Sequence, residues 1–254
     1  MQVDAEFIRN LNEPLKKIVQ DAGNAIMEVY KKDDFESVIK SDGSPVTEAD
    51  NNANKIIIDA LKEITPKVPI VSEETYKKES DIPKTPYWLV DPLDGTKDFL
   101  QRTGNYAMHL SLNYKNKPYL GVVLVPSKDE LWISDGRKVW CESRFGSKKI
   151  FHLSKKKSLQ EMTLVASKNH RNKTLELLID KMNFKNVLSM GSIGCKIASI
   201  IRGESDIYIS LTTSNKSSPK DWDFAAPEII LKTAGGAITK IPIRNPNFLI
   251  LFIY

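Results

Sequence analysis

Two aspartates that follow an apolar run are the residues of this chain best suited to chemistry. Asp91 and Asp94 stand three positions apart, and Gly95 and Thr96 follow them directly. Asp, Pro and Gly are also the commonest turn residues, so this string alone could be an ordinary turn. Two carboxylates at one strand end, however, can share a pair of hard cations, with the intervening Leu93 carbonyl as a further oxygen ligand. Backbone N–H groups at a following helix start would also suit a phosphate group.

Three other segments place acidic residues at the ends of predicted elements. Asp50 lies at the start of a helix, Glu73 follows a short apolar run, and Asp223 lies at the start of a later helix. Taken singly, each is more often structural, for example as an N-cap or a first-turn charge. Four such acidic ends in one chain indicate one shared site. Ligands of the carboxylate, carbonyl and water type favour Mg²⁺ over zinc.

The order of these motifs resembles that of the inositol monophosphatase superfamily, whose members are Mg²⁺-dependent, lithium-sensitive phosphatases. The matching strings are Val-Thr-x-Ala-Asp, Ser-Glu-Glu, Trp-x-x-Asp-Pro-Leu-Asp-Gly-Thr-Lys-Asp-Phe and Trp-Asp-x-Ala-Ala-Pro-Glu, and they lie within roughly residues 10–240. Asp-Gly-Thr-Lys-Asp-Phe and Lys-Asp-Trp-Asp are similar to the 3′(2′),5′-bisphosphate nucleotidase branch of this superfamily, which includes the bacterial CysQ proteins.

The resemblance implies a role for each acidic residue. It implies that Asp50 and Thr96 orient and deprotonate the attacking water. It also implies that two or three Mg²⁺ ions per site are held by Glu73, Asp91, the Leu93 carbonyl, Asp94 and Asp223, with Asp223 lying against the substrate as well.

The resemblance also implies substrate contacts. The turn at Gly95 and Thr96 would bind the phosphate, and His170, Ser192 and Lys196 would lie on the nucleotide side. A lone histidine is more often a surface or core residue than a ligand contact, so His170 rests on the match alone. The glycines before Lys196 lack the spacing of a phosphate-binding P-loop. The segment after the Gly-Gly pair at 235–236 is shorter than the family norm.

The function implied is hydrolysis of the 3′-phosphate of adenosine 3′,5′-bisphosphate to AMP and phosphate by a metal-activated water. Inositol monophosphatase or fructose-1,6-bisphosphatase activity on the same scaffold is an alternative. A non-catalytic relative that binds bisphosphorylated nucleotides is a second alternative, although all the expected metal ligands are present. The expected partner is therefore a small-molecule nucleotide.

The elements that must position these residues are predicted from apolar spacing. Two helices with one apolar face each are predicted over residues 4–31 and 48–64. Buried or antiparallel strands are predicted over 68–72, 87–90, 106–113, 119–126 and 130–134. After a lysine-rich break at 147–160, strands are predicted over 163–166, 187–190, 206–211 and 237–241, and helices over 174–182, 195–202 and 225–234.

This order of elements predicts an α+β half followed by an α/β half. We expect an N-terminal domain over residues 1–152 that carries most metal ligands. A C-terminal domain over 153–254 would carry the nucleotide contacts and one metal ligand. The family resemblance implies a layered α-β-α-β-α sandwich of the inositol monophosphatase type.

Composition limits the class of protein. The chain has 254 residues, 41% hydrophobic and 27% charged, which suffices for a packed core and excludes a wholly disordered chain. Its start carries no apolar leader, and its longest uncharged apolar run, Phe248–Tyr254, is too short to span a membrane. Cys141 and Cys195 are too few for a disulfide framework and fit no metal-ligand spacing. We expect a soluble, cytoplasmic protein.

The net charge of +5 is unevenly distributed. Residues 146–175 hold eight basic residues against one acidic residue, Glu161, a local charge of +7. A solvated surface loop and a positive rim that attracts an anionic ligand both agree with this pattern. No nucleic-acid-binding motif accompanies it, so a nucleic-acid polymer is not the expected partner.

Overall fold

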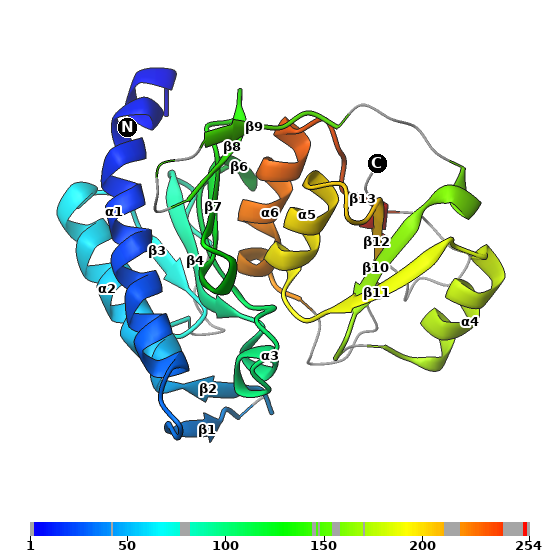
Figure 1. Ribbon diagram of the computed structural model, residues 1–254. Helices are drawn as coiled ribbons and strands as arrows, with labels where there is room; N and C mark the ends of the chain where they lie inside the picture. The colour runs from blue at the N-terminus through cyan, green and yellow to red at the C-terminus, as the bar shows by residue number, and fades with distance from the viewer. Residues whose placement is uncertain are drawn as a thin grey trace.

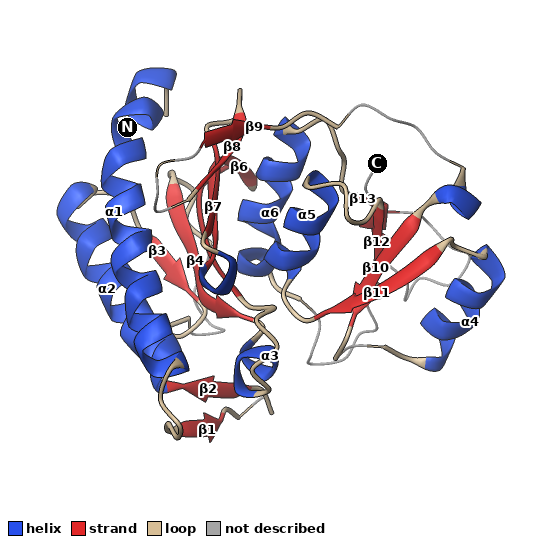
Figure 2. Ribbon diagram, viewed as in Figure 1, coloured by secondary structure: helices blue, strands red, loops and turns tan. Residues whose placement is uncertain are grey.

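Helices and sheets alternate in five layers in the computed structural model of the chain (Figures 1 and 2). The structure describes residues 3–41, 43–76, 82–143, 146, 148–153, 158–169, 171–210, 219–240 and 251–252. The helices are α1 (Ala5–Tyr30), α2 (Glu48–Ile64), α3 (Thr96–Leu100), α4 (Lys173–Met182), α5 (Ile193–Ile201) and α6 (Asp221–Thr233), with 3₁₀ turns at Pro126–Lys128 and Leu159–Glu161.

A seven-stranded sheet with the order β3-β4-β5-β6-β7-β8-β9 is the largest element of the fold. Only β3 and β4 run parallel; the other neighbours are antiparallel. Its strands are β3 (Ile70–Ser72), β4 (Tyr87–Asp94), β5 (Ala107–Tyr114), β6 (Lys117–Val125), β7 (Glu130–Ser134), β8 (Val139–Glu142) and β9 (Lys148–Ile150).

The described residues form three smaller sheets besides this one. The parallel sheet has the order β11-β10-β12, and β1–β2 and β13–β14 are antiparallel pairs. Their bounds are β1 (Ser37–Ile39), β2 (Pro45–Thr47), β10 (Thr163–Ser167), β11 (Asn186–Met190), β12 (Ile207–Ile209), β13 (Thr239–Lys240) and β14 (Leu251–Phe252).

The large sheet is buried on both faces because its side chains alternate between two cores. On β6, Val122 and Leu124 face the core shared with α1 and α2. Val123 and Val125 face the opposite core, which includes residues of α5 and α6. The three-stranded sheet continues this second core on one side and packs against α4 on the other. The α-β-α-β-α sandwich that the sequence predicts is therefore confirmed.

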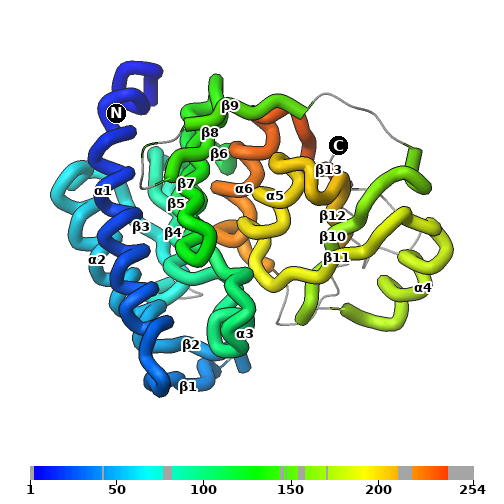
Figure 3. Tube along the Cα trace, in the orientation of Figure 1, coloured from blue at the N-terminus to red at the C-terminus, as the bar shows by residue number. Residues whose placement is uncertain are grey.

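Helix α6 comes late in the chain yet packs on β4, β5 and β6 of the large sheet. In Figure 3 its orange tube lies beside the green strands, and α5 lies next to it. Its approach requires a glycine at position 121, since a Cβ there would stand 2.3 Å from Ile229 and 2.8 Å from the Ala226 carbonyl. The predicted boundary near residue 152 falls between β9 and β10. Both sides of that boundary therefore contribute to the core around α5 and α6.

The long helices agree closely with their predicted ranges, and two differences stand out elsewhere. Strand β4 continues to Asp94, so both aspartates belong to the strand rather than to a turn after it. The β1–β2 hairpin and strands β8 and β9 were not predicted; β1 and β9 are exposed at every position, so no apolar alternation marks them. Residues 241–248, the shortened C-terminal passage, lie outside the described residues. Within the described part of the chain, no helix is long and apolar enough to cross a bilayer.

Candidate active site

The irregular end of β4 positions the central carboxylate. The pairing of β4 with β5 shifts register between Asp91 and Asp94, which is typical of a β-bulge. Asp91 is only 1% exposed, and its Oδ1 accepts a 3.0 Å hydrogen bond from the Leu93 N–H. The bulge therefore lets two aspartates three positions apart lie near one another at the end of an inner strand of the sheet.

Two groups of possible metal ligands meet at Asp91. Glu73, Asp91 and Asp223 form one group, and Asp91, Asp94 and His109 form the other. In each group the ligand atoms all lie within 4.8 Å of one another. The first group joins the end of β3, strand β4 and the first turn of α6, as the sequence predicts. Asp91 belongs to both groups and is therefore the ligand that they share.

Electrostatics favour cations at this place. Burial raises the pKa of Asp91 well above its ordinary value, and the charges of Glu73, Asp94 and Asp223 raise it further. Burial, followed by the charge of Asp94, raises the pKa of Asp223 to about 8. Carboxylates this crowded destabilise one another unless positive charge lies between them. The donor set is rich in oxygen and fits divalent cations.

Asp94 connects the acidic cluster to the second half of the chain. Its Oδ2 accepts hydrogen bonds from the Ser192 hydroxyl at 2.7 Å and from the Ile193 N–H at 2.5 Å. The Gly194 N–H donates to the same oxygen at 3.3 Å. A carboxylate at a helix N-terminus is stabilised by unpaired N–H groups and the helix dipole. Asp94 therefore fixes the start of α5 against β4.

Asp50 and Thr96 lie together, as predicted. The Thr96 hydroxyl is 3.1 Å from both Asp50 Oδ1 and the Leu93 carbonyl oxygen, so it can donate to either. Asp50 is held by a capping box, in which the Thr47 N–H donates to its Oδ2 at 2.8 Å; the Thr47 hydroxyl also donates to this oxygen, at 2.5 Å. Burial raises the pKa of Asp50 to about 6, although the hydrogen bonds from Thr47 lower it. The carboxylate is thus mostly ionised at neutral pH, yet more basic than an exposed one.

Lys40 is a member of the site that the sequence did not reveal. Its ammonium contacts Glu73 at 2.9 Å and Glu74 at 2.7 Å. The pKa of Lys40 is raised because the attraction of these two carboxylates outweighs burial. Burial raises the pKa of Glu74 to about 7 even with this partner. A lysine that follows an exposed strand carries no sequence signal for such a role.

His109 is the second residue missed. It lies opposite Asp91 in the β4–β5 ladder and is 1% exposed. Burial lowers the pKa of His109, so the imidazole is neutral. The sequence does contain a signal for this position. His109, Ser111 and Asn113 are polar residues at every second position of an otherwise apolar strand, and all three are buried.

The predicted nucleotide-side residues that the structure describes are buried and bonded to other groups of the protein. Lys196 is 1% exposed, and its ammonium donates to the Gly191 and Ser192 carbonyls at 2.5 and 3.1 Å. It also lies 5.1 Å from the Tyr208 ring centroid. Lys196 therefore supports the turn before α5 instead of presenting a free charge. Ser192 is fully buried and donates to Asp94, and His170 lies outside the described residues.

The phosphate-turn glycine fits tightly between the two halves. Gly95 has φ of +92°, in the left-handed region that favours glycine. A Cβ on it would lie 3.0 Å from the Asn105 carbonyl and 3.3 Å from Ser192. Nearby, Asn169 donates to Asp98 at 2.7 Å, which ties the segment before His170 to α3. The predicted phosphate turn therefore lies directly against the start of α5.

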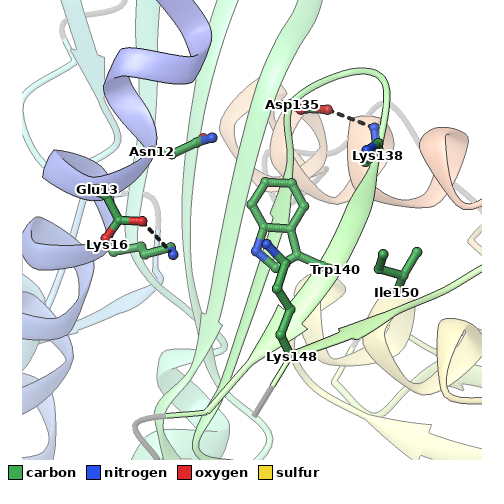
Figure 4. Close-up of a pocket in the computed structure, with 8 residues that line it drawn as sticks. All are labelled: Asn12, Glu13, Lys16, Asp135, Lys138, Trp140, Lys148 and Ile150. Carbon is green, nitrogen blue, oxygen red and sulfur yellow. Dashed lines mark hydrogen bonds and ion pairs between the residues drawn. The ribbon is translucent and has the colours of Figure 1, made fainter. Parts of the chain in front are cut away.

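A hollow of about 250 Å³ lies elsewhere, between α1 and the β7–β9 end of the large sheet (Figure 4). Lys148 stacks over Trp140 there, with its ammonium 4.2 Å from the ring centroid. The hollow contains no member of the acidic cluster. Its lining residues are Asn12, Glu13, Lys16, Asp135, Lys138, Trp140, Lys148 and Ile150.

Known proteins resemble this chain over most of its length. The chain matches the model of the inositol monophosphatase family over residues 8–249. The 3′(2′),5′-bisphosphate nucleotidase CysQ of Buchnera aphidicola is 35% identical over 242 residues, covering 94% of this chain and 88% of the relative. CysQ of Escherichia coli K12 is 32% identical over 226 residues, 87% of each chain. The crystal structure of CysQ from Bacteroides thetaiotaomicron has a TM-score of 0.67 and 26% identity, covering 91% of each chain.

The crowded carboxylates predict an unusual pH dependence of stability. Asp223 titrates near pH 8 in the folded chain but near 3.8 as a free group, so between these values the folded state binds more protons. The free energy of unfolding of the metal-free protein should therefore fall, by an amount on the order of a few kcal/mol, as pH rises through this window. Denaturant unfolding in EDTA at about pH 5 and about pH 8 measures this fall.

Two comparisons test whether Asp223 and its acidic neighbours cause this fall in stability. Excess Mg²⁺ should abolish most of the fall, because cations neutralise the cluster. Asp223→Asn should reduce the fall in EDTA, whereas Asp221→Asn, at an exposed position of the same helix, should leave it unchanged. An equal fall in Asp223→Asn and the unmodified protein would contradict the assignment.

Proposed function

Because this chain belongs to the inositol monophosphatase family, we propose that it is a 3′(2′),5′-bisphosphate nucleotidase that converts adenosine 3′,5′-bisphosphate to AMP and phosphate. The observation that carries the proposal is the sharing of Asp91 between two groups of ligands contributed by separate elements. Its curated relatives named CysQ, at 31–35% identity over most of the chain, support the same activity.

Enzymes of this family depend on metal ions, and we propose Mg²⁺, two or three ions per site. Glu73, Asp91, the Leu93 carbonyl, Asp94 and Asp223 would hold them. Bound Mg²⁺ would supply Lewis-acid activation of a water molecule and neutralise charge on the phosphate. The chain's part is to hold these carboxylates close together despite their mutual repulsion.

We propose that Asp50 and Thr96 orient the attacking water and remove its proton. The Thr96 hydroxyl can accept a hydrogen bond from the water and donate its own hydrogen to Asp50, 3.1 Å away. The water oxygen then attacks phosphorus, the bond to the 3′ oxygen breaks, that oxygen takes up a proton from solvent, and Asp50 releases its proton to solvent before the next turnover. Since Asp50 is ionised at neutral pH and anchored by Thr47, it can receive the proton without moving.

We propose that the Gly95–Thr96 turn binds the phosphate and that the second half of the chain selects a nucleotide. The N–H groups of the Gly95–Thr96 turn would bind the phosphate, and His170 would contact the nucleotide. Ser192 and Lys196 would act indirectly, by holding Asp94 and the turn before α5. The basic segment 146–175 would attract a ligand with a second phosphate away from the scissile one.

A substrate panel tests this proposal. Phosphate release should be far faster from adenosine 3′,5′-bisphosphate than from inositol 1-phosphate, fructose 1,6-bisphosphate or AMP, because only the first offers both a nucleoside and a second phosphate. EDTA should abolish release, and Li⁺ should inhibit it. Equal kcat/KM for inositol 1-phosphate and the nucleotide would overturn the substrate assignment. Full turnover in EDTA would overturn the metal-dependent mechanism.

A hydroxyl at position 96 should be essential for turnover but not for metal binding. Thr96→Val keeps the side-chain volume and removes the donor, so kcat should fall by about 10²-fold or more. Thr96→Ser is the matched control and should retain most activity. Calorimetry should find the same Mg²⁺ affinity in both variants. A Thr96→Val enzyme with normal kcat would exclude the proposed path of the proton.

A further inference from the structure

Asp98 is a fully buried acidic residue that lies outside the acidic cluster. Its exposed fraction is 0%, and the two groups of possible metal ligands among the described residues do not include it. It lies in α3, the short helix that begins at the turn we assign to the phosphate. A buried carboxyl group requires hydrogen-bond donors in place of water. The donors that Asp98 finds therefore identify the segments that α3 holds.

The two carboxyl oxygens of Asp98 bind different halves of the chain. Oδ1 accepts a 2.7 Å hydrogen bond from the hydroxyl of Thr103, in the loop after α3. Oδ2 accepts a 2.7 Å hydrogen bond from the side-chain amide of Asn169, 71 positions later in the chain. Asn169 directly precedes His170, the residue we assign to the nucleotide. Asp98 therefore joins the helix of the phosphate turn to the nucleotide side of the site.

The turn before α5 lies against the same carboxyl group. A Cβ on Gly191 would overlap Asp98 Oδ2, so only a glycine lets this turn approach α3 so closely. The Gly191 carbonyl also accepts the hydrogen bond from Lys196. The two segments that the sequence places on the nucleotide side therefore meet at one side chain of α3, through residues 169 and 191.

A second bond between α3 and the segment before His170 is exposed. The Lys168 ammonium donates to the side-chain oxygen of Gln101 at 2.5 Å, and both residues are exposed. Water competes for an exposed hydrogen bond, whereas the bond from Asn169 has a buried carboxylate acceptor. Asp98 therefore provides the main link between α3 and residues 167–169, and the exposed pair provides a control.

We propose that Asp98 is a positioning residue that sets the specificity for a nucleotide. By holding Asn169, it fixes residues 167–169 at one distance from the phosphate turn, and its own burial keeps it away from the substrate. A nucleoside attached to the scissile phosphate spans that distance, whereas inorganic phosphate does not. The inference rests on the proposed nucleotidase function and adds a residue that selects the substrate indirectly.

Steady-state kinetics of an Asn169→Ala variant test this role. The KM for adenosine 3′,5′-bisphosphate should rise about tenfold or more, the usual effect of losing a hydrogen bond to a carboxylate, with little change in kcat. The inhibition constant of inorganic phosphate, which occupies only the phosphate turn, should be unchanged. Gln101→Ala removes the exposed bond alone, so this matched control should leave both constants unchanged.

A swap of the two side chains separates their contact from a general effect on folding. Asn169→Asp should raise the KM at least as much as Asn169→Ala, because two carboxylates then face each other. Adding Asp98→Asn to this variant should restore most of the normal KM, since an amide again donates to a carboxylate. This comparison stands even if Asn169→Ala fails to fold.

Three results would each overturn the role of Asp98: a normal KM in Asn169→Ala, an equal rise in the KM and in the phosphate inhibition constant, or no recovery in the double variant. All three leave the nucleotidase proposal intact, since they compare variants with an unmodified enzyme that hydrolyses the nucleotide. If the unmodified protein did not prefer the nucleotide to inositol 1-phosphate, the proposed function would fail, and this inference with it.

Discussion

The burial of Asp91 among other carboxylates is the constraint on which the rest of the structure depends. Asp91 is 1% exposed, and Glu73, Asp94 and Asp223 all raise its pKa. A chain that folds only for stability would avoid such an arrangement, since each buried charge needs compensation. The surrounding elements supply part of it: Lys40 pairs with Glu73, and the N-terminus of α5 binds Asp94. Divalent cations would supply the rest.

The same constraint explains why the two halves of the chain are joined where they are. Asp94 comes from β4, but its Oδ2 is occupied by Ser192 and the first N–H groups of α5. Asp223 reaches the cluster from the first turn of α6. Its Oδ2 also caps that helix by accepting a hydrogen bond from the Lys220 N–H. The acidic site therefore holds the middle helical layer in place, and a substrate bound at the end of β4 would lie next to the start of α5.

Much of this could be predicted from the sequence because the signals were local. The periodicity of α1 and α2 and the acidic strings around Asp50, Asp91 and Asp223 need no tertiary context. His109 and Lys40 were missed because their roles arise from pairing between strands and from a hairpin that places a lysine near Glu73. Lys196 was predicted to lie on the nucleotide side; that its side chain folds back onto the carbonyls before α5 is an arrangement that no sequence pattern reveals.

The most direct test of the account is the number of metal ions bound by variants of the shared ligand. Calorimetric titration of the unmodified protein with Mn²⁺ should reveal two or more binding events. Asp91→Asn should weaken at least two of them together, because Asp91 belongs to both ligand groups, whereas Glu73→Gln should weaken one. If Asp91→Asn lost a single binding event and kept the others at normal affinity, Asp91 would not be the shared centre of the site.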